Sequence, residues 1–95
     1  MSRRKKSYKV PVHIKRFCAN FRYLFSQSEM SRTAVRRHLT TRYGYTIHLD
    51  ILNAILDGKY VELKAEGIEA VAKLFGYTSS EMMNFDLDKD YTKYF

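Results

Sequence analysis

Lysine and arginine are the residues of this chain whose type and placement point most clearly to chemistry, and they gather in its first half. Residues 1–43 hold 12 of the 17 lysines and arginines but only one acidic residue, Glu29, which gives a net charge of +11. Residues 44–95 sum to −4, which leaves +7 for the whole chain. Clustered cations bind polyanions by displacing the counterions of phosphate groups. The distribution of charge therefore favours a nucleic acid as the partner.

Other reactive residues do not form a catalytic or metal-binding pattern. His13, His38 and His48 are isolated, with no second ligand at a suitable spacing, so we predict no metal site. Cys18, the single cysteine, has no partner for an internal disulfide or a cysteine-based zinc site. No glycine-rich phosphate loop or nucleophile–base pair is evident. We expect a protein that is not an enzyme and uses no cofactor or small-molecule substrate.

Length and apolar content indicate one small globular domain. A chain of 95 residues with 45% apolar residues can form a core of its own. No apolar run approaches the roughly 18 residues of a membrane-spanning helix, and no signal-peptide core follows Lys6. We expect a soluble cytoplasmic protein without a membrane partner.

Apolar spacing predicts the elements that must position the cations. Residues 1–10 form a basic flexible arm, residues 11–84 the folded domain, and residues 85–95 an acidic and aromatic tail. The tail fits a packed segment, a short strand or a dimer contact equally well. A first helix over residues 11–26, with Pro11 at its first position, carries an apolar stripe at helical spacing: Ile14, Phe17, Cys18, Phe21, Leu24 and Phe25. Cys18 is therefore predicted to be buried.

A second helix carries the arginines. Ser31 is its predicted N-cap, and Gly44 stops it. Val35, Leu39 and Tyr43 recur at i+4 and face inward. Its basic residues have no acidic residue at i±4, which predicts that they lack internal partners and favours an external one: Arg32, Arg36, Arg37 and Arg42.

Three further helices complete an all-α domain of four to five helices. Thr46 or Asp50 can cap a third helix that ends at Gly58 and buries Ile51, Leu52, Ile55 and Leu56. A fourth ends at Gly76 and buries Ile68, Val71, Ala72 and Phe75, with Gly67 inside it where glycine permits close packing. Thr78 and Glu81 have the spacing of a capping box that begins a short fifth helix. No strand pattern is present.

This order of helices, with three segments in it, resembles the helix-turn-helix domains of the Cro and phage-repressor type (the XRE family). The segments are residues 30–32 (MSR), residues 55–59 (ILDGK) and residues 68–78 (IEAVAKLFGYT), the last followed by residues 81–83 (EMM). The resemblance covers roughly residues 20–85. It implies a compact, lambda-repressor-like bundle that binds duplex DNA sequence-specifically as a transcription regulator. We expect a repressor that acts as a homodimer.

In such a domain the third helix enters the major groove. The residues then expected to contact bases are Leu49, Asp50, Asn53 and Ala54. Asn53 can pair with adenine through two hydrogen bonds, and Asp50 can accept from a cytosine amino group. Asp50 and Asp57 can equally be only an N-cap and a helix-end residue. The residues expected to contact phosphates are Arg3, Arg4, Lys5, Lys6, Arg32, Arg36, Arg37 and Lys59.

Two alternatives stay open at this point. Leu49, Asp50 and Asp57 on the third helix also suit a protein–protein adaptor, of antitoxin or anti-repressor type, that keeps the shape without binding DNA. Eight tyrosines and six phenylalanines allow an RNA-binding module that stacks bases on aromatic rings. The aromatic residues expected to be exposed for this purpose are Tyr8, Tyr45, Tyr60, Tyr91 and Tyr94.

Overall fold

Five helices account for most of residues 10–88, the part of the chain that this computed structural model describes. They are α1 (Val12–Gln27), α2 (Arg32–Tyr43), α3 (Leu49–Leu56), α4 (Ala65–Phe75) and α5 (Ser79–Asn84), and no strand occurs within the described range. The prediction of an all-α domain is confirmed. The predicted basic arm up to residue 9, with Tyr8, and the tail from residue 89, with Tyr91 and Tyr94, lie outside the described residues.

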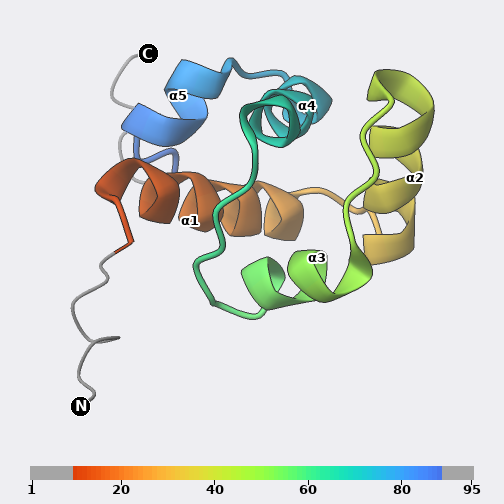
Figure 1. Cartoon of the computed structure of the whole chain (residues 1–95), viewed down its shortest axis with the longest axis horizontal. Coiled ribbons are helices and arrows are strands. Elements are labelled where there is room, and N and C mark those ends of the chain that lie inside the picture. The colour runs from red at the N-terminus through yellow and green to blue at the C-terminus, as the bar shows by residue number, and fades with distance from the viewer. Residues whose placement is uncertain (1–9, 89–95) are drawn as a thin grey trace.

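The other helices are arranged around α1, the longest of the five (Figure 1). α3 packs on one side of α1, whereas α4 and α5 pack together on the other side. α2 stands beyond the carboxyl end of α1 and contacts α4 (Figure 1). The connection from α3 to α4 crosses α1, where the Cys18 thiol donates a hydrogen bond to the carbonyl oxygen of Val61 at 3.3 Å.

The apolar stripe of α1 faces the core, as predicted, although Leu24 and Phe25 near its end are only half-buried. Ile14, Phe17, Cys18 and Phe21 are buried, and the Phe21 ring lies 5.9 Å from the Phe17 ring and 6.0 Å from the Phe75 ring of α4. Such tilted ring pairs add to the free energy gained by burying apolar area. Burial raises the pKa of the Cys18 thiol, more than the hydrogen bond to Val61 and the charge of Arg22 lower it. The thiol is therefore neutral at physiological pH.

α2 begins and ends where its capping residues predict. The Ser31 hydroxyl accepts a hydrogen bond from the backbone N–H of Ala34 at 3.1 Å, and Gly44 closes the helix with φ +67°. An L-residue with a side chain rarely adopts this left-handed conformation, so glycine fits here. Val35 and Leu39 are buried, and Tyr43 is half-buried against the core.

The start of α3 differs from the prediction. Neither Thr46 nor Asp50 caps it; the N-cap is His48, whose side chain makes no capping hydrogen bond. The reason is that Ile47 is buried, which fixes the chain one residue before the cap. Asp50 then lies in the first turn, where a carboxylate interacts favourably with the helix dipole. The helix ends at Leu56, and Gly58 turns the chain away with φ +110°.

The last two helices form as predicted. In α4, Ile68, Val71 and Ala72 are buried, whereas Phe75 is half-buried. In the capping box of α5, the Thr78 hydroxyl accepts from the backbone N–H of Glu81 at 3.1 Å. The Glu81 carboxylate in turn accepts from the backbone N–H of Thr78 at 2.9 Å.

A buried asparagine of α1 holds the segment that follows α5. The Asn20 amide nitrogen donates to the carbonyl oxygens of Met82 at 2.8 Å and Phe85 at 2.7 Å. Its oxygen accepts from the backbone N–H of Leu87 at 3.0 Å, and the Leu87 side chain is buried. The beginning of the predicted tail, residues 85–88, is therefore a packed segment.

Gly67 permits the close approach of an aromatic ring from the connection between α2 and α3. A Cβ atom built on Gly67 would lie 2.5 Å from the Tyr45 hydroxyl oxygen and 2.6 Å from the ring carbon that carries it. Tyr45 is half-buried, so the prediction that it is exposed is wrong, whereas Tyr60 is exposed as predicted. Burial, and to a lesser extent the charge of Glu66, raise the pKa of the Tyr45 hydroxyl.

This contact makes the effect of Gly67→Ala depend on Tyr45. In an unobstructed helix, replacing an interior glycine by alanine stabilises the folded state by about 0.5–1 kcal/mol. Here the added methyl group must displace the tyrosine ring, and overpacking of this kind costs about 1–3 kcal/mol. We expect Gly67→Ala to destabilise the natural chain but to stabilise the Tyr45→Ala variant, as measured by urea unfolding. Stabilisation in both backgrounds would show that the ring does not pack on Gly67.

Candidate nucleic-acid interface

The arginine that begins α2 lies directly beside the outer face of α3. One terminal nitrogen of the Arg32 guanidinium donates to the Asn53 side-chain oxygen at 2.7 Å, and the other donates to an Asp57 carboxylate oxygen at 2.9 Å. Asn53 and Asp57 are four residues apart, so they lie on the same side of α3 and its end. We call Arg32, Asn53 and Asp57 the Arg32 cluster. It places a predicted phosphate contact and a predicted base contact on one surface.

The prediction that the arginines of α2 lack internal partners is wrong for two of them. Arg32 forms the ion pair with Asp57, and the Nε of Arg36 donates to the carbonyl oxygen of Ile47 at 3.1 Å. The spacing rule missed these partners because it considers only neighbours within the same helix. The guanidinium groups of Arg37 and Arg42 have no hydrogen-bond or ion-pair partner among residues 10–88.

The four predicted base-contact residues are all accessible, to different degrees. Leu49 has 44% of its surface exposed, and Asp50 is also exposed, whereas Asn53 and Ala54 are half-buried. Asp50 is not an N-cap, so that interpretation is wrong. Asp57 does follow the last residue of α3, where it forms the ion pair with Arg32.

Of the remaining predicted phosphate contacts, one lies within residues 10–88 and the others lie outside them. Lys59 is exposed just after Gly58, and its backbone N–H donates to the carbonyl oxygen of Ala54 at 2.9 Å. The other four lie outside the described residues: Arg3, Arg4, Lys5 and Lys6.

Threonines share the outer face of α2 with its arginines, although no threonine was among the predicted contacts. A shallow depression there is lined by Thr33, Arg36, Arg37, Thr40 and Thr41. The Thr40 and Thr41 hydroxyls donate to the carbonyl oxygens of Tyr45 at 3.4 Å and Arg37 at 2.8 Å. Thr33 stands one turn before Arg37, so its hydroxyl can serve the same phosphate as the guanidinium. Thr33, Thr40 and Thr41 are spaced so that they lie on one face of a helix. This spacing is the sequence feature from which the polar face could have been predicted.

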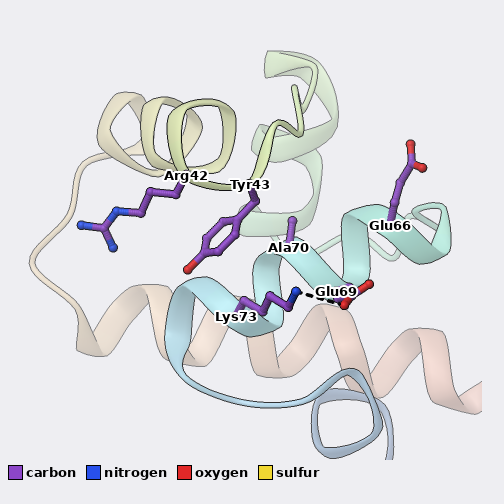
Figure 2. Close-up of a pocket in the computed structure, with 6 residues that line it drawn as sticks. All are labelled: Arg42, Tyr43, Glu66, Glu69, Ala70 and Lys73. Atoms are coloured by element: carbon purple, nitrogen blue, oxygen red, sulfur yellow. Dashed lines mark ion pairs between the residues drawn. The ribbon is translucent and has the colours of Figure 1, made fainter.

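A second hollow, between α2 and α4, has a mixed character (Figure 2). Arg42, Tyr43, Glu66, Glu69, Ala70 and Lys73 line it. Lys73 and Glu69 form an ion pair within α4 at 3.2 Å. Two cations and two carboxylates give this hollow no net charge, so it offers a polyanion no net attraction. It is not part of the candidate interface.

The part of the chain that the structure describes contains neither a metal-binding group of side chains nor a membrane-spanning helix. No group of three or more histidines, cysteines or carboxylates gathers there in a way that could hold a metal ion. None of the described helices is long and apolar enough to cross a membrane.

No protein-family model, curated protein or solved structure matches this chain. The candidate interface is defined by the geometry of three neighbouring parts: the outer face of α2, the connection through Ile47, and the exposed side of α3. The Arg32 cluster joins the first of these to the last.

Proposed function

We propose that this chain binds duplex DNA through α2 and α3, as a helix-turn-helix transcription regulator of the Cro and phage-repressor type. It acts as a cytoplasmic repressor and binds its site as a homodimer, without catalysis. The observation that carries the proposal is the hydrogen bond from Arg32 to Asn53, since it places the basic start of α2 beside the exposed side of α3.

The dimensions of α3 suit this role. An α-helix with its side chains is about 10–12 Å in diameter, and the major groove of B-DNA is about 12 Å wide. α3 enters the groove with Leu49, Asp50, Asn53 and Ala54 toward the bases. Arg37 on α2 and Lys59 after α3 then contact phosphates on either side, together with the basic arm.

The ion pair within the Arg32 cluster reduces an electrostatic difficulty of this arrangement. Carboxylates on a helix that approaches phosphates weaken binding, and α3 and its end carry Asp50 and Asp57. Arg32 neutralises Asp57 at 2.9 Å. Among residues 10–88, Asp50 is then the one carboxylate on this side of α3 without an ion pair, and its oxygens can accept from a cytosine amino group.

Two single substitutions test the assignment of roles. We expect Arg37→Ala to weaken binding to a similar extent on every duplex sequence, because a phosphate contact carries no sequence information. We expect Asn53→Ala to change the preferred sequence, with a loss of about 1–3 kcal/mol on the preferred site alone. Gel-shift titrations on a selected site and on a scrambled duplex measure both effects.

Lys73→Ala is the matched control for Arg37→Ala. It removes one exposed cation from α4, which packs on the other side of α1 from α3. We expect its affinity for both duplexes to stay close to that of the natural chain. An Asn53→Ala variant with an unchanged sequence preference would remove Asn53 from the set of base contacts.

A protein–protein adaptor is the second candidate, and the same face supports it. The ion pair of Arg32 with Asp57 occupies a cation that DNA binding could use, while Leu49 leaves 44% of its surface exposed. An apolar side chain beside the exposed carboxylate of Asp50 suits a protein partner of basic character. The dependence of binding on salt concentration distinguishes the two candidates.

A further inference from the structure

We infer that Arg32 determines which base Asn53 reads, and that this base is guanine. The inference rests on the proposed binding of duplex DNA and names a specificity-determining pair within that site. It follows from the chemistry of the donors and acceptors in the Arg32 cluster.

A guanidinium group donates hydrogen bonds and cannot accept them. The Asn53 side chain must therefore turn its oxygen toward Arg32, and the distance of 2.7 Å is that of a charge-assisted hydrogen bond. The amide nitrogen, at the other end of this planar group, has no hydrogen-bond partner among residues 10–88. Asn53 thus presents donors to a ligand.

Asp57 keeps the guanidinium in place. It accepts from the second terminal nitrogen of Arg32 at 2.9 Å, so the planar group is held at two points rather than one. A charge held at two points loses less conformational freedom on binding a ligand than a free arginine does. The Asn53 amide is oriented by Arg32, and Arg32 is oriented by Asp57.

This arrangement favours guanine over adenine. Adenine presents an acceptor and a donor in the major groove, so Asn53 would need both its nitrogen and its oxygen to pair with it. Guanine presents two acceptors, N7 and O6, which match the Asn53 nitrogen and a remaining N–H of Arg32. Because the Asn53 oxygen is engaged by a cation, the pair acts as a set of donors. The pair is therefore expected to read guanine, whereas Asn53 without Arg32 would be expected to read adenine.

Selection from a randomised duplex library with the purified full-length chain tests the inference. Comparison of the natural chain with Asn53→Ala identifies the base position that Asn53 reads. At that position we expect guanine to be preferred over adenine by at least about fivefold. We expect Arg32→Lys to keep this preference, because an ammonium group also only donates, and Arg32→Met to shift it toward adenine.

Asp57→Asn is a second variant that leaves Arg32 itself unchanged. It removes the ion pair that orients Arg32, so we expect the guanine preference to weaken in the same direction as in Arg32→Met. Thermal unfolding checks that each variant is folded, and Asp57→Asn decides the outcome if Arg32→Met is not. A natural chain that prefers adenine at the Asn53 position, or a preference unchanged in both Arg32→Met and Asp57→Asn, overturns the inference while DNA binding stands. A natural chain that binds no duplex at all overturns the proposed function instead.

Discussion

Replacing Asn20 by alanine is expected to lower the free energy of unfolding by about 3 kcal/mol, because each buried polar group left unpaired costs about 1–3 kcal/mol. Asn20 is 2% exposed, and its side chain bonds to backbone groups of Met82, Phe85 and Leu87. Alanine supplies no donor or acceptor in their place. It also detaches the segment after α5 from α1, which exposes the buried Leu87 side chain.

Urea unfolding of Asn20→Ala and Asn84→Ala separates this effect from the general cost of losing an asparagine. Asn84 is exposed on α5, and its amide nitrogen bonds to the Ser80 hydroxyl at 3.1 Å. We expect Asn84→Ala to change the free energy of unfolding by no more than about 0.5 kcal/mol. A loss below about 1 kcal/mol for Asn20→Ala would mean that water replaces the asparagine at the three backbone groups.

Much of the fold could be predicted because its helices follow local rules. The stripe of α1 places Ile14, Phe17 and Phe21 on one side through a period of 3.6 residues, and all three are buried. Ser31, Gly44 and Thr78 act on the backbone within a few residues of themselves, so their effects can be read without knowledge of the fold. The start of α3 lacked such a residue, and there the prediction failed.

Contacts between distant parts of the chain could not be predicted in this way. Ile47, Leu63 and Leu87 are buried outside the helices, where no helical period marks the inward-facing positions. Asn20 lies beside an apolar stripe, and its partners are more than sixty residues away.

The candidate site has the same limitation as these contacts. The arginines of α2 were recognisable as a basic face, but their relation to Asp57 and Ile47 depends on how α3 is placed against α2. Residue spacing predicted which side chains form the basic face of α2. The packing of helices determines which of its cations are already occupied.

Raising the salt concentration from 50 to 200 mM is expected to weaken the binding of one protomer to a duplex that carries a single half-site about a thousandfold. Each phosphate contact contributes about −0.9 to the slope of the logarithm of the affinity against the logarithm of the salt concentration. Six predicted phosphate contacts are counted here. The side chains of Arg37 and Lys59 form no ion pair or bond to a carbonyl oxygen among residues 10–88, and the other four lie outside these residues: Arg3, Arg4, Lys5 and Lys6. The six contacts give a slope of about −5, which fluorescence anisotropy with a labelled duplex measures. Arg37→Ala should bring the slope about one unit closer to zero.

The value of this slope also reports what Arg32 and Arg36 do in the complex. If both left their internal partners for phosphates, the slope would approach about −7 rather than −5. We expect the smaller value, because Arg32 would have to break its ion pair with Asp57 and leave a carboxylate unpaired next to the DNA. A slope near zero, or no binding to duplex DNA, would instead favour the adaptor. The exposed Leu49 and the carboxylate of Asp50 would then be the part of α3 that meets a partner protein.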